Sequence, residues 1–369
     1  MKVTRVALLL SASVSLFSSR LLAQTPPEVP SALAADVVVT AEAAPEKERT
    51  LGVAATVIDR AEIERSKKTS VLELLRTVPG LDVVQSGGPG GVASLFLRGT
   101  NSTQTLVLLD GVKVNSPFFG AFDLATLSTA DVERIEVVRG PFSALYGSEA
   151  IGGVVQVFTK RNASGVDAAG TFAAGSLSAR EGTARASFGN GPFTFTAGFR
   201  RTTTDGDLPN AFFAATNAAA AADLTSGAFR VGVTFRRDES RSGVPFSGAT
   251  ATPRQFTTAE TTAVSVPVSL SLGASTTLEA AATYTKDRPA YSNVDDPYGF
   301  TFSKTEAGRA GGRITLVTTL GGHRISIGTD YERTRVDNED AFGVEIDGKT
   351  TRTISAFAED RVSLFGEKL

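Results

Sequence analysis

Few residues of this 369-residue chain stand in patterns that catalyse reactions or hold metals. Ser143 and Ser148 flank Tyr146-Gly147, but no Gly-x-Ser-x-Gly elbow surrounds them and no histidine base lies nearby. The single histidine, His323, stands in no triad or metal-ligand pattern, and the chain has no cysteine. The sequence therefore predicts no catalytic residue and no enzyme.

Carboxylates and glycines suggest two further kinds of site. Asp295-Asp296 and Asp205-x-Asp207 are carboxylate pairs in polar segments, where either solvated loop charge or Ca²⁺ fits. The glycine-rich run 87–91 lacks the Lys-Ser/Thr and the helix that a phosphate cradle needs, so a flexible surface loop is expected. We predict no metal site and no cofactor, with calcium on external loops left open. A net charge of −2 also argues against nucleic-acid binding.

The first residues have the features of an export signal. Lys2 and Arg5 precede the apolar run Val6–Phe17, and cleavage after Ala23 is the expected processing step. The apolar run is too short for a membrane-spanning helix. We therefore predict a signal peptide at 1–23, followed by a linker at 24–44 that is rich in proline and alanine.

Residues 45–161 have the pattern of a compact α+β domain. Asp59 and Ser70 are expected to cap helices, and the second helix would bury one apolar face and end at Pro79-Gly80. Asp110-Gly111 predicts a tight hairpin, and Ser143–Tyr146 one helical turn. The expected strands are Val53–Ile58, Leu81–Val84, Ser94–Leu97, Thr105–Leu109, Val112–Val114, Ile135–Val138 and Val154–Phe158.

From residue 162 onward helical patterns disappear and strict alternation begins. Apolar side chains alternate with Thr, Ser, Gly and charged residues in 193–200, 229–236, 266–272 and 324–330. A soluble sandwich also alternates, but connections that are short at 189–191 and 320–322 and long at 205–223, 238–258 and 287–299 favour an outer-membrane barrel. We expect an antiparallel transmembrane β-barrel segment at 162–369.

The string Asp131–Lys160, with Arg98-Gly99-Thr100-Asn101 and Leu108–Val112 upstream, resembles the plug domain of TonB-dependent outer-membrane receptors. The branch that it resembles most is that of the vitamin B12 (cobalamin) receptors, over roughly 36–160. This resemblance implies active uptake of a scarce small-molecule ligand, most simply a corrinoid. It also implies a monomer among outer-membrane lipid of a Gram-negative bacterium.

A short segment before the domain is similar to the family's TonB box. A buried strand is the alternative, but the segment lies between polar or proline-containing stretches, and an extended β-branched peptide can add a strand to a partner's sheet edge. The implied partner is TonB in the periplasm, with ExbB and ExbD acting indirectly. The residues concerned are Asp36, Val37, Val38, Val39, Thr40 and Ala41.

The resemblance also assigns roles within the plug. Arg98 and Arg139 would face acids of the barrel wall. The positions that would meet ligand are Val92, Ser94, Asn101, Phe119 and Gly120. Pro117-Phe118-Phe119 departs from the family's smaller and more polar loop, which leaves an iron-siderophore or haem receptor as an alternative; packing of Phe118 and Phe119 against the barrel is the non-functional interpretation.

Size raises a third alternative. Residues 165–369 provide roughly nine or ten strands, whereas plugged transporters have about 22. The chain also ends in Glu367-Lys368-Leu369 rather than in an aromatic residue. We therefore expect about half of a 22-stranded barrel, in which case the product is either a truncated receptor or a remnant that does not transport.

Overall fold

The computed structural model describes residues 54–86, 88, 90–161 and 164–362, and the backbone of 38–39 and 46–47. The predicted signal peptide 1–23 lies outside the described residues. So does the predicted linker, apart from Val38–Val39. Those two residues form β1, which pairs antiparallel with β2 (Glu46–Lys47).

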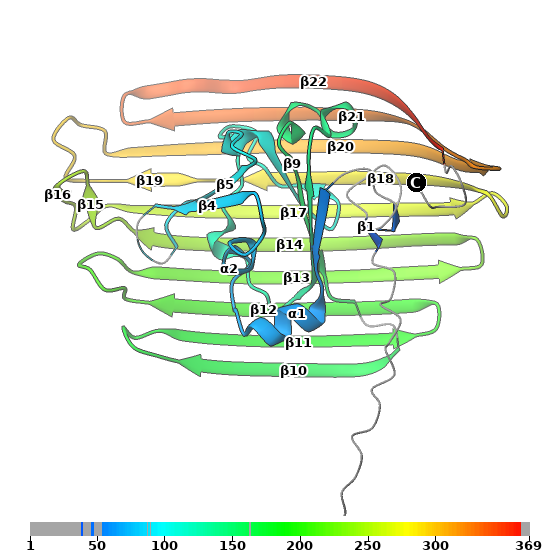
Figure 1. Ribbon diagram of the computed structural model, residues 1–369. Helices are drawn as coiled ribbons and strands as arrows, with labels where there is room; N and C mark the ends of the chain where they lie inside the picture. Colours follow the sequence, from blue (N-terminus) through cyan, green and yellow to red (C-terminus); the bar gives the residue numbers. More distant parts are fainter. Residues whose placement is uncertain are drawn as a thin grey trace, which may run out of the picture. The chain divides into compact units, whose positions relative to one another are not determined.

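The expected plug domain is present as an α+β unit (Figure 1). Its elements are β3 (Ala54–Ile58), α1 (Arg60–Ser66), α2 (Val71–Leu75), β4 (Leu81–Gln85), β5 (Ala93–Leu97), η2 (Ser102–Gln104), β6 (Thr105–Leu109), β7 (Val112–Lys113), η3 (Leu124–Thr126), β8 (Val132–Arg139), α3 (Ser143–Tyr146), η4 (Ser148–Ala150) and β9 (Gly153–Thr159). The three short 3₁₀ turns, η2 to η4, were not expected from the sequence.

Both predicted helix caps form. The Asp59 carboxylate accepts a hydrogen bond from Glu62 N at 2.8 Å, and Ser70 Oγ accepts one from Leu72 N at 3.2 Å. These bonds satisfy backbone donors that the first turn of a helix leaves free. The apolar face of α2 is buried, as its spacing predicts, and it packs in the core of the domain.

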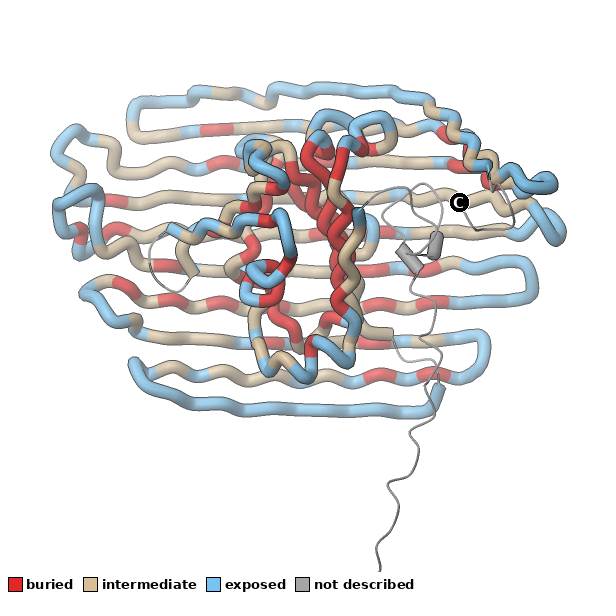
Figure 2. Tube along the Cα trace, in the orientation of Figure 1, coloured by how far each residue is buried: buried red, intermediate tan, exposed pale blue. Residues whose placement is uncertain are grey.

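The plug core lies on a five-stranded sheet of order β3-β8-β9-β6-β7. The β6–β9 pair is parallel and the other pairs are antiparallel. Asp110 and Gly111 both have positive φ, of 47° and 82°, so the β6–β7 hairpin closes through the predicted tight turn. Figure 2 shows that buried residues gather along these strands.

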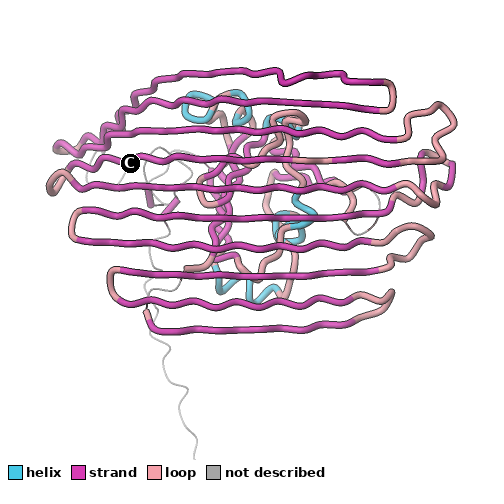
Figure 3. Tube along the Cα trace, turned by 180° about the vertical axis from the view of Figure 1, so that it is seen from behind, coloured by secondary structure: helices cyan, strands magenta, loops and turns pink. Residues whose placement is uncertain are grey.

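A second, much larger antiparallel sheet follows, which we call the wall (Figure 3). Its order is β10-β11-β12-β13-β14-β17-β18-β20-β21-β22, in agreement with the predicted nine or ten strands, with the short β19 pairing β17 and β20. The bounds are β10 (Gly165–Ala174), β11 (Arg180–Asn190), β12 (Phe193–Thr204), β13 (Phe213–Ser226), β14 (Phe229–Gly243), β15 (Phe246–Ser247), β16 (Thr250–Ala251), β17 (Phe256–Ser271), β18 (Thr276–Asp287), β19 (Ala290–Ser292), β20 (Phe302–Leu320), β21 (His323–Asp340) and β22 (Gly343–Val362).

The two faces of the wall have opposite chemistry. One face exposes large apolar side chains, among them Phe195, Phe235, Tyr284, Ile314 and Tyr331. The face toward the plug buries polar side chains, among them Thr196, Arg200, Thr234, Ser265, Thr285 and Arg309. Exposed apolar and buried polar positions are the reverse of a soluble sandwich and are typical of a lipid-facing barrel wall. No helix in the described part of the chain is long and apolar enough to cross a membrane.

Two of the predicted long connections are shorter than expected. Strand β13 (Phe213–Ser226) begins within the predicted loop 205–223 and takes up more than half of it, and β14 continues to Gly243, into the predicted loop 238–258. The run of alanines in β13 shows no alternation, so the strand carries no sequence signal. The strand forms because β12 and β14 pair with it along its length.

Candidate functional site

The predicted ligand-contact residues lie on two neighbouring loops and one strand of the plug. Asn101 caps η2, and its carboxamide accepts from Thr103 N. A Cβ on Gly120 would lie 3.0 Å from Thr103 Cγ2, so the η2 turn and the loop 116–121 are in close contact. Phe119, beside Gly120, is 56% exposed. These three predicted residues therefore share one surface.

Buried Asn115 holds this surface in place. Its amide nitrogen donates to Thr105 O and to Gly120 O, both at 3.0 Å, and its Oδ1 accepts from Val107 N at 2.7 Å. One side chain thus joins the 116–121 loop to strand β6. Because the backbone groups of Thr105 and Val107 are buried and would lose these hydrogen bonds, the side chain is costly to replace.

Asp123 links Val92 and Ser94 to the same region. Its Oδ1 accepts from Ala93 N and from Ala125 N, both at 3.0 Å, so the start of β5 lies against the end of the 116–123 segment. Burial raises the pKa of Asp123, and its two backbone hydrogen bonds oppose that shift. The structure therefore brings all five predicted residues to connected parts of the plug.

Contacts with the wall show which end of the barrel this region approaches. The wall strands are joined at one end by short turns, at 191–192, 227–228, 272–275 and 321–322, and at the other by longer loops, apart from the two-residue turn 341–342 between β21 and β22. Ser242, at the long-loop end of β14, donates to Gly90 O at 3.0 Å. Ser116 lies beside Asp287, at the long-loop end of β18. The loops that carry Val92 and Phe119 thus lie toward the long-loop end.

The predicted role of Arg139 needs correction. Its guanidinium bonds Thr56 Oγ1 at 2.7 Å, Ala55 O at 3.1 Å and Pro79 O at 3.2 Å, all inside the plug. Within the described residues it reaches no acid of the wall, because the side chain turns from the end of β8 across β3. Burial, and secondly the charge of Arg98, lower the pKa of Arg139. The predicted contact of Arg98 with a wall acid stays a prediction.

Charged plug–wall contacts form in both directions, with the cation on the wall in some and on the plug in others, as in Arg161–Asp223. Arg309 Nη2 lies 2.7 Å from Glu149 Oε1 of the plug, and Arg313 Nη2 donates to Leu145 O at 2.6 Å. In the other direction, Lys113 Nζ lies 3.4 Å from Glu332 Oε2. These contacts hold the α3–η4 segment and the β7 hairpin against β20 and β21.

Sequence reasoning missed these residues, although a signal was present. Arg309 and Arg313 are four residues apart in a strand, and Asp330 and Glu332 two apart, so each pair shares one face. The face is the polar one that the alternation assigns to the lumen. The sequence does not show that the plug covers this polar face beside Arg309 and Arg313; that follows only from the register of the folded sheet.

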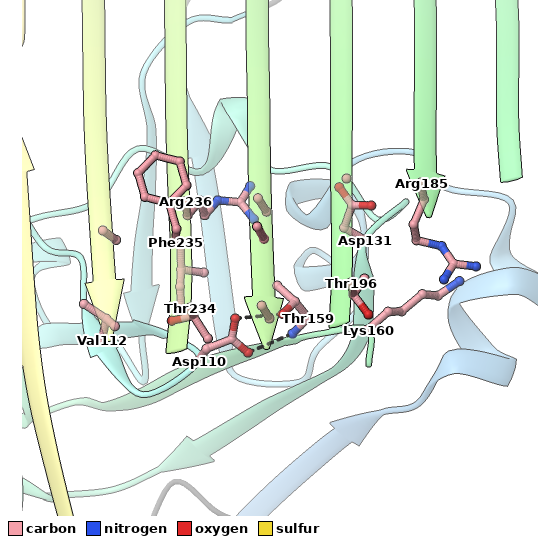
Figure 4. Close-up of a pocket in the computed structure, with 16 residues that line it drawn as sticks. Asp110, Val112, Asp131, Thr159, Lys160, Arg185, Thr196, Thr234, Phe235 and Arg236 are labelled. Atoms are coloured by element: carbon pink, nitrogen blue, oxygen red, sulfur yellow. Dashed lines mark hydrogen bonds between the residues drawn. The ribbon is translucent and has the colours of Figure 1, made fainter. Parts of the chain in front are cut away.

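A small cavity of about 30 Å³ lies between the plug and the wall on the short-turn side (Figure 4). Charged side chains line it, including Asp131, Lys160 and Arg185. Burial raises the pKa of Asp131 and lowers that of Lys160. Asp110 accepts from Thr159 N and Oγ1 at its edge. The space holds about one water molecule and is too small for a ligand.

One of the two carboxylate pairs considered for calcium, Asp295-Asp296, binds other groups of the chain. Asp295 pairs with Arg254, and Asp296 Oδ1 accepts from Tyr298 N and Phe300 N. Across the described ranges no group of three His, Asp or Glu side chains is arranged to hold a metal. Calcium on the external loops stays a prediction.

The predicted TonB box is mostly outside the described residues. Asp36, Val37, Thr40 and Ala41 fall there, and of Val38 and Val39 the structure gives only the strand pairing with Glu46–Lys47. Its role therefore stays a prediction.

Comparison with known proteins identifies the N-terminal domain. Residues 47–154 match the family described as the TonB-dependent Receptor Plug Domain. The N-terminal domain is therefore a plug domain of the TonB-dependent receptor type. A vitamin B12 transporter, BtuB of Vibrio vulnificus, is 47% identical over 123 residues, which are 33% of this chain and 20% of that protein.

Solved structures of receptors have the same fold. The siderophore receptor PiuA from Acinetobacter baumannii matches with a TM-score of 0.65 and 18% identity, over 87% of this chain and 55% of PiuA. The ferric citrate transporter FecA matches with a TM-score of 0.69 and 16% identity, over 85% of this chain and 54% of FecA. The chain thus spans about half the length of these receptors. A plug domain beside a wall of this fold fits the predicted location in the outer membrane of a Gram-negative bacterium.

Proposed function

We propose that the chain serves TonB-dependent uptake of a corrinoid such as vitamin B12. The observation that carries the proposal is the set of connected loops holding Asn101, Phe119 and Gly120, which Asn115 fixes toward the long-loop end of the wall. The 47% identity to a vitamin B12 transporter supports the same ligand class. Uptake would be driven through TonB, with ExbB and ExbD behind it.

A siderophore is the second candidate, and one feature favours it. Phe118 and Phe119 form an edge-to-face pair with ring centroids 4.8 Å apart, and both rings are exposed. An exposed aromatic pair offers a stacking surface to a planar aromatic chelate of iron. The neighbours PiuA and FecA are themselves described as a siderophore receptor and a ferric citrate transporter.

Equilibrium binding to the purified full chain in detergent separates the two ligands. We expect cyanocobalamin to bind and ferric citrate and a ferric catecholate not to bind. Phe119→Ser should weaken binding about tenfold, because loss of one buried aromatic contact is worth roughly 1.5 kcal/mol or more. Phe193→Ser, on the exposed face near a short turn, is the control and should bind as the parent chain does. Binding of the ferric chelates alone would overturn the corrinoid proposal.

The TonB partnership has its own test. Val39→Pro removes a backbone donor from the predicted TonB box, so capture of the chain by the periplasmic domain of TonB should fall at least tenfold. Ala34→Pro, outside the box, is the control. Equal capture of all three chains would reject Asp36–Ala41 as the TonB-binding segment. Uptake of labelled cyanocobalamin by cells that lack their own receptor then distinguishes transport from binding alone.

A further inference from the structure

Strands β21 and β22 are neighbours at one edge of the wall (Figure 1). Their register and exposure place three arginines together on the lipid-facing side. Arg333 and Arg335 are two residues apart on β21 and share a face. Arg352 of β22 is the register partner of Arg333. All three are exposed, and we call them the arginine patch.

The Arg333–Arg352 pair is unusual because like charges directly opposite each other destabilise a sheet. Nearby cations are neutralised by acids. Arg335 Nε lies 3.1 Å from Asp337 Oδ2, and Lys286 Nζ lies 2.5 Å from Glu306 Oε1. For Arg333 and Arg352, by contrast, the described part of the chain provides no hydrogen bond and no ion pair. The sheet therefore holds two adjacent positive charges that an outside anion would stabilise.

The neighbouring strand leaves room for such an anion. Arg333 is opposite Ala310 of β20, and Arg335 is opposite Gly308. On the far side of Ala310 lies Tyr284 of β18. A strip of small residues thus separates the arginines from an exposed tyrosine, and a headgroup can approach the sheet there.

The position of the arginine patch along the strands, relative to the apolar band, indicates the kind of anion. Tyr331 and Ile354 are register partners one step nearer the short-turn end, and they are 44% and 78% exposed. Ile327 continues the apolar face below them. Tyrosines at the rim of an apolar band mark the membrane interface of a barrel. The patch lies directly above that rim, on the long-loop side.

We propose that the arginine patch binds the phosphate headgroup of a phosphorylated lipid in the outer leaflet, whose acyl chains lie along Ile354, Tyr331 and Ile327. Guanidinium groups bind phosphate oxygens through paired hydrogen bonds, and a phosphate between Arg333 and Arg352 removes their mutual repulsion. The apolar rows directly below fit a lipid better than a free anion. This inference is independent of the ligand that the receptor transports.

The test uses the purified full chain in detergent and native mass spectrometry with bisphosphorylated lipid A as the probe. The same lipid lacking one phosphate is the second probe, and inorganic phosphate is the soluble competitor. Arg333→Gln/Arg352→Gln is the test variant. Arg254→Gln/Lys349→Gln, which removes the same charge from other exposed positions, is the control.

We expect bisphosphorylated lipid A to remain bound to the parent and control chains, and its apparent affinity to fall at least tenfold in the test variant. Lipid should also raise the melting temperature of the parent chain more than that of the test variant. In lipid-free detergent the test variant should melt no lower than the parent, because the substitution relieves a repulsion. Equal lipid binding by the two chains would overturn the proposal. So would full competition by inorganic phosphate at the lipid's own concentration, which would indicate a free-anion site.

Discussion

Replacing Arg309 by methionine should loosen one end of the plug while leaving the wall folded. Arg309 is buried, and its guanidinium lies between Glu149 of the plug at 2.7 Å and Glu332 of the wall at 3.3 Å. Methionine retains much of the apolar stem but removes the charge. Glu149 would then lose the guanidinium that it contacts, whereas Glu332 would keep Lys113.

The size of the effect follows from the burial of these groups. Breaking a fully buried ion pair costs about 3–5 kcal/mol. The Glu149 and Glu332 side chains are 20% and 25% exposed, so water partly compensates and the cost should be smaller. A hydrogen bond to a charged group is worth about 1.5–3 kcal/mol. We therefore expect a loss of about 2 kcal/mol in local stability, roughly a 30-fold change in the opening equilibrium.

Amide hydrogen exchange reports this opening locally. Tyr146 N donates to Phe142 O at 3.0 Å, Gly147 N to Ser143 O at 2.9 Å, and Ala150 N to Gly147 O at 3.1 Å, all in the clamped segment. These amides should exchange about 30-fold faster in Arg309→Met, since exchange follows the free energy of local opening. Amides of β13, far along the wall, should keep the parent rate.

The control is Arg254→Met, which removes an exposed ion pair with Asp295 and should change stability by less than about 1 kcal/mol. A double-mutant cycle with Glu149→Gln isolates the pair, and its coupling energy should be about 1–2 kcal/mol. Unchanged exchange at Tyr146–Ala150, or a coupling energy near zero, would refute the claim that the Arg309–Glu149 contact holds this segment.

Two further predictions concern the plug. Burial raises the pKa of Asp123 in the folded chain. The Asp123 carboxyl therefore makes its full contribution to stability below its ordinary pKa of ~3.9, and this contribution is lost as the pH rises through the raised pKa. Asp123→Asn should flatten this part of the melting temperature's dependence on pH; an unchanged slope would contradict the assignment. Gly153→Ala should destabilise the plug by about 2–4 kcal/mol in denaturant titration, because φ is +148° and the new Cβ would lie 2.2 Å from Val138 O. Gly312→Ala, whose Cβ meets only Ala281 O at 3.8 Å, should cost under about 1 kcal/mol, and equal losses would reject the steric argument.

Local chemistry made most of the plug predictable. Asp59 and Ser70 are strong caps, Asp110-Gly111 permits few turns, and α3 covers the predicted Ser143–Tyr146. Each of these signals acts over a few neighbouring residues, so no tertiary information was needed. The wall was predictable for a similar reason, since strict alternation is visible wherever the outward residue is large.

Two features could not be read from the sequence, for different physical reasons. Strand β13 is built largely from alanine, which gives no contrast between its faces, and only pairing with β12 and β14 defines it. The contacts of Arg139 depend on which way a long side chain turns at the end of β8. The ligand-contact residues were predicted from the resemblance alone and stay a prediction. The buried groups that hold their loops, Asn115 and Asp123, appear only once loops distant in sequence are folded together.

Three arginines on the inner face of the wall each have an acid on the wall itself. Arg200 pairs with Glu181 at 2.6 Å, Arg236 with Asp238 at 2.7 Å and Arg313 with Asp330 at 2.5 Å. To the plug, Arg200 and Arg313 donate to backbone carbonyls, and Arg313 also lies 4.9 Å from the centroid of the Tyr146 ring. If the plug moves away at these arginines, water can replace a carbonyl, and each guanidinium keeps its acid. The wall can therefore part from the plug there at low electrostatic cost, whereas separation at Arg309–Glu149, Lys113–Glu332 and Arg161–Asp223 would break charge pairs.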